Sequence, residues 1–326
     1  MTVIRRKFGK TGWAVSEISF GAWQLGGQWG AVNDDESVSA LLSAYEAGIN
    51  FVDTAQMYGL GHSETIVGRS LRQWNGEKIY VATKVQPVSW PSVQNDNPSF
   101  ADLYPIEHLE KNIEDSRRRL NVDCIDLYQL HCWAPDGLKN LEWFEVLSKY
   151  RDQGKISKIG VSIRDYRPED GIELAESGLV DSIQVIYNIF EQEPDKQLFE
   201  AAETGDTAII ARVVLDSGAL SGTWNENTYA TWEEGSVLHT LYRDERFAET
   251  LERLQPLVQL TKNYYPTLAE AAVRFALSRP QVSTAILGMT TAKRIRENLA
   301  FSDGAEFPID LRGALKEHEW RRNYYV

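Results

Sequence analysis

Short apolar segments alternate along the chain with segments in which apolar residues recur every three or four positions. The apolar segments are six to eight residues long and rich in Ile and Val, which is typical of buried strands. They predict strands at residues 16–23, 49–55, 78–85, 124–131, 157–163, 181–188, 207–214 and 283–288. The periodic segments predict amphipathic helices, among them residues 34–48, 63–74, 105–120 and 141–154.

Strand–helix alternation of this kind requires a parallel sheet with helices packed outside it. Eight such units, with no Pro/Ser-rich linker between them, predict one α/β domain over residues 1–326, a (β/α)8 TIM barrel rather than two doubly wound halves. Residues 5–18 have two glycines around a tight turn and predict an N-terminal β-hairpin that caps the bottom of the barrel. Residues 86–105 and 216–244 interrupt the alternation, which predicts long loops after strands 3 and 7.

Composition narrows the class of protein. The chain of 326 residues is 43% hydrophobic and 25% charged, as in ordinary globular proteins, and its formal net charge is -13. That charge argues against nucleic acid and anionic membrane surfaces as partners. We find no apolar run long enough to span a bilayer, and the two cysteines make no disulfide framework, so a cytoplasmic location is expected.

Polar residues stand at the ends of three consecutive predicted strands. Asp53 ends the second strand, with Tyr58 five residues later; Lys84 ends the third and His131 the fourth. Singly, each has an ordinary structural explanation, such as a turn cap, a solvated charge or a satisfied core histidine. The C-terminal ends of barrel strands line one rim, so we expect these four side chains to meet there.

The four residues suit proton transfer to a carbonyl oxygen. A phenol is a reluctant acid at neutral pH, because its ordinary pKa is about 10. A nearby ammonium would lower the pKa of Tyr58, and a carboxylate would hold that ammonium in place. His131 could orient the substrate oxygen or share in relaying the proton. No side chain supplies a hydride, so the site would need a nicotinamide cofactor.

A phosphate site is predicted after the eighth strand, in the segment "ILGMTTAKRIREN" (residues 286–298). Gly288 allows close backbone approach, and Thr290 or Thr291 can cap a helix whose free N–H groups would face an anion. Arg294, in the first turn, is unfavourable for the helix dipole unless it meets a negative group such as a 2′-phosphate. A solvated basic face is the alternative explanation.

The ordered motifs "FVDTAQMYGLGHSETIVGRSL", "VATKV", "DLYQLH", "IGVS" and "RIREN" together resemble the aldo-keto reductase family over almost the whole chain. The resemblance implies a (β/α)8 barrel that binds NADPH, or less often NADH, without a Rossmann motif, and that reduces aldehydes and ketones. It also implies that the family's catalytic tetrad corresponds to Asp53, Tyr58, Lys84 and His131.

The resemblance further implies a set of cofactor contacts along the rim. These are Gly21, Ala22, Trp23, Asp53, Ser162, Gln184, Arg212, Val213, Leu215, Gly218, Leu220, Gly222, Gly288, Thr290, Arg294 and Asn298. Two positions depart from the family pattern: Ile163 replaces a frequent Asn, and Arg212 replaces a frequent aromatic residue, which leaves the role of Arg212 open. Arg294 favours NADPH over NADH.

The substrate is expected to be a small carbonyl compound, including sugars, held by Trp23, Tyr58, His131 and Trp133, and no metal is expected. Other tryptophans that could line the mouth are Trp29, Trp90, Trp224 and Trp232. Two alternatives stay open: a nicotinamide-binding regulatory or redox-sensor subunit with little turnover, and a metal-dependent hydrolase with Asp53, His62 and His131 as ligands. A homo-oligomer is compatible with the sequence, which leaves the oligomeric state open.

Overall fold

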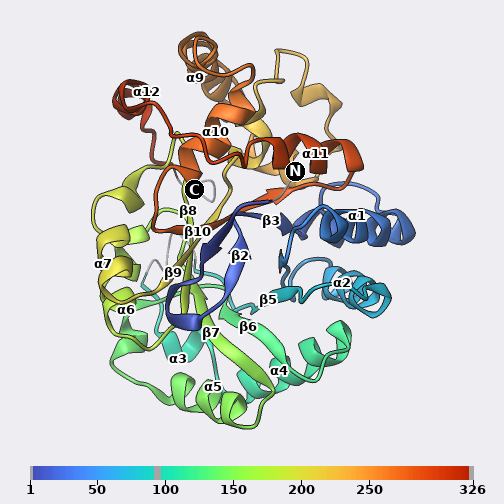
Figure 1. Ribbon diagram of the computed structural model, residues 1–326. Helices are drawn as coiled ribbons and strands as arrows, with labels where there is room; N and C mark the ends of the chain where they lie inside the picture. Colours follow the sequence, from blue (N-terminus) through green and yellow to red (C-terminus); the bar gives the residue numbers. More distant parts are fainter. Residues whose placement is uncertain (1–2, 92–96, 323–326) are drawn as a thin grey trace.

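Eight parallel strands close into a barrel in a computed structural model that describes residues 3–91 and 97–322 (Figure 1). Around the barrel the strands follow the order β10-β3-β4-β5-β6-β7-β8-β9, so chain neighbours are also neighbours in space. They are β3 (Ile18–Gly21), β4 (Phe51–Asp53), β5 (Tyr80–Val85), β6 (Ile125–Leu130), β7 (Ile156–Ser162), β8 (Ser182–Ile186), β9 (Ala208–Arg212) and β10 (Val282–Gly288). All eight predicted strands are present, and the predicted (β/α)8 barrel is confirmed.

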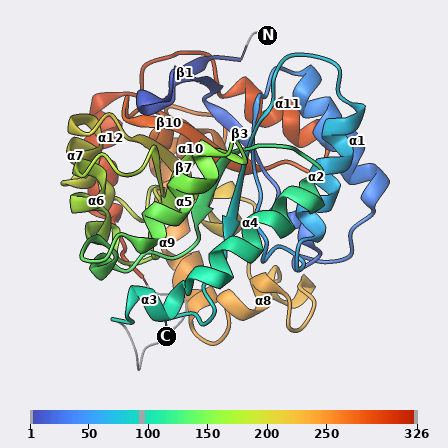
Figure 2. The same cartoon turned by 90° about the horizontal axis from the view of Figure 1, so that it is seen from below.

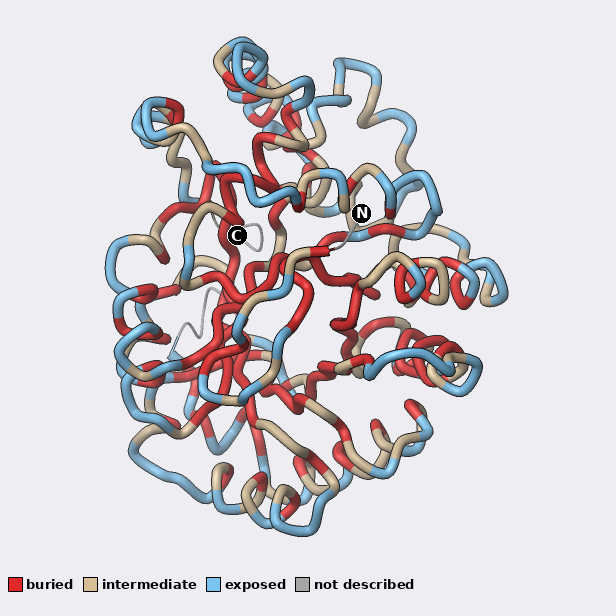
Figure 3. Tube along the Cα trace, viewed as in Figure 1, coloured by how far each residue is buried: buried red, intermediate tan, exposed pale blue. Residues whose placement is uncertain are grey.

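Helices surround the barrel (Figures 1 and 2). The α-helices are α1 (Asp34–Glu46), α2 (His62–Gln73), α3 (Phe100–Leu103), α4 (Ile106–Leu120), α5 (Glu142–Asp152), α6 (Ile172–Glu176), α7 (Leu198–Thr204), α8 (Val237–Leu241), α9 (Arg246–Thr261), α10 (Leu268–Leu277), α11 (Ala292–Ala300) and α12 (Ile309–Leu315). Short 3-10 helices are η1 (Gly9–Thr11), η2 (Trp23–Gly26), η3 (Pro135–Leu138), η4 (Pro168–Gly171), η5 (Glu193–Asp195), η6 (Asp216–Ser221), η7 (Tyr229–Thr231) and η8 (Lys316–His318). Figure 3 shows the strands buried and the helices exposed on their outer sides, as amphipathic helices require. Among the described helices, none has the length and hydropathy to cross a bilayer.

The predicted hairpin is also present. Strands β1 (Arg5–Lys7) and β2 (Ala14–Ser16) pair antiparallel, and η1 connects them. Phe8 and Val15 are fully buried against residues from the lower half of the barrel, so the hairpin covers that end. Gly9 has φ +49, and a Cβ there would lie 2.6 Å from the carbonyl oxygen of Asp206, so only glycine fits this close approach.

The barrel interior has two layers of side chains. The lower layer, at the end covered by the hairpin, is apolar, and the upper layer, at the C-terminal ends of the strands, is polar. Side chains two residues apart on a strand point the same way, so each strand contributes to both layers. The pairs that show this are Phe51 and Asp53, Ala82 and Lys84, Leu127 and Gln129, and Ile210 and Arg212. The four lower residues belong to the cluster packed on the hairpin. The polar layer therefore lies on an apolar base, at the C-terminal ends of the strands.

The two predicted long loops have structure of their own. The segment after β5 contains α3, although residues 92–96 of the predicted loop lie outside the described part of the chain. The segment after β9 contains η6, η7 and α8. Trp320, near the C-terminus, donates its backbone N–H to Phe190 at 2.7 Å, and Arg322 forms an ion pair with Asp216 of η6. The last described residues are thus attached to the segments after β8 and β9.

A buried carboxylate next to this segment gives a prediction for stability. Glu191 is 7% exposed, and its Oε1 has no hydrogen-bond partner among the described residues. Burial raises the pKa of Glu191 to about 7, although the charge of Arg321 acts in the opposite direction. The folded chain therefore holds a proton that the unfolded chain loses near pH 4.5. The free energy of unfolding should fall between pH ~4.5 and ~7, by up to about 3 kcal/mol.

Glu191→Gln imitates the protonated form and should remove this loss. The variant is expected to be more stable than the parent at pH 8 and nearly equal to it at pH 4, as measured by urea unfolding. Glu176→Gln, a matched change at an exposed position, should have no such pH-dependent effect. If Glu191→Gln changed the free energy of unfolding equally at pH 8 and pH 4, the raised pKa of Glu191 would be contradicted.

Candidate active site

Asp53, Lys84 and Tyr58 meet at the C-terminal ends of β4 and β5. The ammonium of Lys84 donates to Oδ2 of Asp53 at 2.6 Å and to the carbonyl oxygen of Thr54 at 2.9 Å. Its third contact is the phenol oxygen of Tyr58, at 3.4 Å. Lys84 is fully buried, so its charge depends on this carboxylate partner. The three side chains lie together as the sequence predicts.

The second carboxylate oxygen of Asp53 is bonded from across the barrel. Nε2 of Gln184 donates to Oδ1 at 2.9 Å, and Nε2 of Gln129 lies 3.4 Å from the same atom. Both amides belong to the polar layer, on β8 and β6. Asp53 therefore has hydrogen-bond partners on both oxygens, and these partners offset the cost of burying its polar atoms.

Glycine packing holds the loop that carries Tyr58. Gly59 has φ +62, and a Cβ there would lie 2.3 Å from the carbonyl oxygen of Gly26 in η2. In turn, a Cβ on Gly26 would lie 2.6 Å from the backbone carbon of Tyr58. This contact requires glycine on both sides, and it joins the loop after β4 to the loop after β3.

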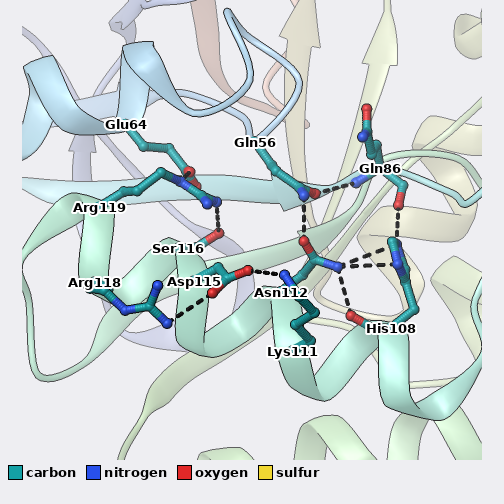
Figure 4. Close-up of polar contacts among 10 residues, drawn as sticks. All are labelled: Gln56, Glu64, Gln86, His108, Lys111, Asn112, Asp115, Ser116, Arg118 and Arg119. Carbon is teal, nitrogen blue, oxygen red and sulfur yellow. Dashed lines mark hydrogen bonds and ion pairs between the residues drawn. The ribbon is translucent and has the colours of Figure 1, made fainter.

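Helix α4 supports the same loop from outside (Figure 4). The Gln56 side chain bonds Asn112, and its Oε1 accepts from the backbone N–H of Gln86 at 3.4 Å. His108 Nε2 contacts the carbonyl oxygen of Gln86 at 2.8 Å. Residues just after β4 and β5 are thus tied to one helix, which limits the movement of Tyr58 relative to Lys84.

Burial sets the proton states of the site. It raises the pKa of Tyr58 well above its ordinary range; the charge of Asp53 adds to this, and that of Arg212 opposes it. The expectation that Lys84 would lower the pKa of Tyr58 is therefore not met, because burial and then the charge of Asp53 raise this pKa. Burial also lowers the pKa of Lys84, although Asp53 opposes this. Tyr58 holds its proton at neutral pH and can donate it.

His131 follows β6 and lies edge-on to Tyr58, with ring centroids 6.0 Å apart. Burial lowers the pKa of His131 well below its usual range, and the charges of Lys84 and Arg212 lower it further. The imidazole is therefore neutral. Its Nδ1 is buried without a hydrogen-bond partner among the described residues, so it retains an unused polar atom.

Trp23 and Trp90 form aromatic walls beside these residues. Trp23 stacks on Tyr58 at 5.8 Å between centroids and meets Trp29 edge-on at 5.1 Å. Trp90 packs edge-on against His131 at 5.3 Å. The sequence places Trp90 in the long loop after the Lys84 strand, but it does not distinguish Trp90 from the other tryptophans that could line the mouth.

Trp133, expected at the substrate, lies elsewhere. It is fully buried in an aromatic cluster with Phe100 and Trp143, at 5.3 and 5.6 Å between centroids. Its ring has no surface left for a substrate, so we correct that expectation. Trp224 and Trp232 likewise pack on Tyr242, in the loop after β9.

Positions expected to hold a cofactor gather on the rim between β7 and β3. Ser162 and Gln184 are paired in register, and both are almost fully buried. Gly288 and Gly21 are also paired in register; a Cβ on Gly288 would lie 2.9 Å from Oε1 of Gln24. The remaining expected positions follow three strands: Ala22 and Trp23 follow β3; Val213, Leu215, Gly218, Leu220 and Gly222 follow β9; Thr290, Arg294 and Asn298 follow β10.

The loop after β9 turns through left-handed conformations. Val213, Asp216 and Ser217 have φ of 55, 48 and 53, and Gly218 has φ 106. The hydroxyl of Tyr242 donates to the carbonyl oxygen of Asp216 at 2.6 Å and helps to hold this shape. Successive backbone N–H groups in such turns can form anion-binding concavities.

The N-terminus of helix α11 has features expected of an anion-binding site, and Arg294 adds a positively charged side chain to it. Oγ1 of Thr291 caps the helix by accepting from the backbone N–H of Arg294 at 3.2 Å. The Arg294 side chain is exposed, and within the described part of the chain its ion pair is a long one, with Glu297 at 3.6 Å. Asn298 is buried, and its Nδ2 has no partner among the described residues. A ligand with a phosphate and a ring-nitrogen acceptor would fit these groups.

Arg212 and Asp165 form a pair that the sequence did not predict. Nη2 of Arg212 donates to Oδ1 of Asp165 at 2.6 Å and to the carbonyl oxygen of Ile163 at 2.9 Å. Asp165 carries no sequence signal, because its role depends on a contact between loops.

The alternative of a metal site finds no support in the structure. Nε2 of His62, at the start of α2, contacts Oδ1 of Asp34, at the start of α1, at 2.9 Å. In the part of the chain that the structure describes, no three His, Cys, Asp or Glu side chains form a metal-binding group.

Comparison with known proteins shows the family of this chain. Residues 17–319 match the model of the Aldo/keto reductase family. The chain is 31% identical to aldo-keto reductase YhdN of Bacillus subtilis, over 85% of this chain and 82% of that protein. It is 28% identical to the NADH-specific methylglyoxal reductase of Escherichia coli, over 90% and 91% of the two chains. Among solved structures, the glycerol dehydrogenase AKR11B4 of Gluconobacter oxydans superposes with a TM-score of 0.76 at 27% identity, covering 98% of this chain and 95% of that one. The chain therefore belongs to the aldo/keto reductase family of oxidoreductases, which act on carbonyl groups.

Proposed function

We propose that this enzyme reduces an aldehyde or ketone to an alcohol with NADPH, and that Tyr58 is the proton donor. The observation that carries the proposal is the contact of Lys84 with both Asp53 and Tyr58, at 2.6 and 3.4 Å. When bound at the rim, the nicotinamide would supply the hydride. The protonated state of Tyr58 suits a general acid rather than a base.

The remaining residues have positioning roles in this proposal. Neutral His131 would orient the carbonyl oxygen towards Tyr58 through a hydrogen bond, while Trp23 and Trp90 would exclude water from the carbonyl. Lys84 would hold Tyr58 through its third hydrogen bond and stabilise negative charge on the phenol oxygen as the proton leaves. Aromatic walls of this kind suit sugars as well as planar aldehydes.

We further propose that the cofactor contacts follow the rim. Ser162 and Gln184 would hold the carboxamide, the loop from Leu215 to Gly222 would cover the pyrophosphate, and Asn298 would bond the adenine ring. Arg294 would meet the 2′-phosphate of NADPH, which NADH lacks. Relatives differ in this respect, since one is named as NADH-specific.

Arg294→Ala should weaken NADPH binding by about tenfold, the scale of one charge-assisted contact, and leave NADH binding unchanged. Both dissociation constants can be measured by quenching of tryptophan fluorescence. Arg296→Ala, an exposed arginine on the same helix, is the matched control and should change neither. An equal loss for both nucleotides would contradict a 2′-phosphate contact.

The test of the whole proposal is a titration with NADPH and NADH, followed by turnover with a panel of aldehydes, ketones and sugars, monitored at the reduced-nicotinamide absorbance. Binding with turnover is expected. Binding without turnover on any carbonyl would favour a nicotinamide-binding regulatory subunit instead. Absence of binding would mean that Ile163 and Arg212 mark the loss of the cofactor site.

A further inference from the structure

The Arg212–Asp165 pair is held at the mouth of the barrel. Arg212 ends β9, and its side chain reaches across β8 to contact Ile163 and Asp165, which follow β7. The Arg212 and Asp165 side chains are only 20% and 15% exposed. A pair this buried keeps both charges in place near the polar layer, and solvent screens it less than a surface pair.

The Arg212–Asp165 pair lies on the mouth side of Ser162 and Gln184, the proposed carboxamide site. Ser162 on β7 pairs in register with Gln184 on β8, and Ile163 directly follows Ser162. Arg212 is level with Ile186, which is one pleat nearer the mouth than Gln184. The guanidinium thus stands on the mouth side of the two residues that we propose hold the nicotinamide, and the inference rests on that proposed function.

Both charges act on the candidate catalytic residues. The charge of Arg212 lowers the pKa values of Tyr58, Lys84 and His131, and that of Asp165 raises the pKa of Tyr58. These opposite directions indicate that each member of the pair is within electrostatic reach of the place where substrate and cofactor would meet.

We propose that Asp165 and Arg212 together set the relative affinity of the site for oxidised and reduced cofactor. The nicotinamide ring is positively charged when oxidised and neutral when reduced. A guanidinium beside the ring therefore disfavours the oxidised form, and a carboxylate favours it. Asp165 offsets Arg212, which keeps NADP⁺ and NADPH closer in affinity than Arg212 alone would allow.

The experiment compares dissociation constants of NADP⁺ and NADPH by tryptophan fluorescence. Asp165→Asn keeps the size and an acceptor for Arg212 but removes the negative charge. It should raise the ratio of the NADP⁺ constant to the NADPH constant by about tenfold, the effect of one partly screened unit charge. Arg212→Gln should change the ratio in the opposite direction. Glu169→Gln, which removes a charge from an ion pair in the same loop, should leave the ratio unchanged.

Opposite changes from the two variants would not arise from structural damage, which would weaken both forms of the cofactor together. A ratio that stays the same in Asp165→Asn and Arg212→Gln, while the parent binds both nucleotides, would overturn this inference and leave the proposed function standing. If Asp165→Asn does not fold, Arg212→Gln alone decides by the same ratio. Failure of the parent to bind either nucleotide would overturn both proposals.

Discussion

Tyr58→Phe is expected to lower kcat by about 10²- to 10⁴-fold, the usual contribution of a positioned general acid. The phenol oxygen lies 3.4 Å from the Lys84 ammonium, and Phe removes only this oxygen. The ring would stay between Trp23 and His131, so the affinity for NADPH should be nearly unchanged. Steady-state kinetics and nucleotide titration measure the two effects separately.

Tyr45→Phe is the matched control. Tyr45 is another buried tyrosine, and its hydroxyl bonds Ser70 at 2.9 Å in the helical layer rather than in the barrel mouth. This variant should keep its turnover. If Tyr58→Phe kept turnover close to that of the parent, Tyr58 would not be the proton donor and another acid would have to be sought.

Lys84→Met should abolish measurable turnover and destabilise the fold. Oδ2 of Asp53 would lose its partner at 2.6 Å and become an uncompensated charge in a buried site. Removing one member of such a pair costs about 3–5 kcal/mol. Urea unfolding should report this loss, and the same substitution at Lys7, which forms an exposed pair with Asp206, should leave the free energy of unfolding nearly unchanged.

The double variant Asp53→Asn with Lys84→Met distinguishes stability from catalysis. It removes both charges and keeps an oxygen that can accept from Gln184. We expect it to recover much of the lost stability and none of the turnover. A double variant as unstable as Lys84→Met alone would mean that the cost lies in packing and not in the unpaired charge.

The barrel could be predicted because each element follows from local sequence. Every buried parallel strand is a short apolar run, and short connections leave few ways to join such strands. The meeting of Asp53, Lys84 and His131 follows from the same rule, since strand ends share one rim. Tyr58 follows because it is only five residues beyond Asp53.

The aromatic walls could not be predicted in the same way. Trp90 and Trp133 both lie in loops beyond adjacent strands, yet one packs on His131 and the other fills a cluster between α3 and α5. Whether a loop tryptophan faces the site or the helical layer depends on how its loop folds over the neighbouring loops. Asp165 was missed for the same reason, and the burial that governs the Tyr58 proton became visible only with the packed barrel.

The two layers inside the barrel suggest where this enzyme can be engineered. Phe51, Ala82, Leu127 and Ile210 pack on the hairpin, and each lies one pleat below a residue of the polar layer. Libraries that repack only this lower layer can be selected for heat tolerance without touching the reactive groups. Changes of substrate range belong to the upper rim and its loops, so the two properties can be evolved in separate rounds and then recombined.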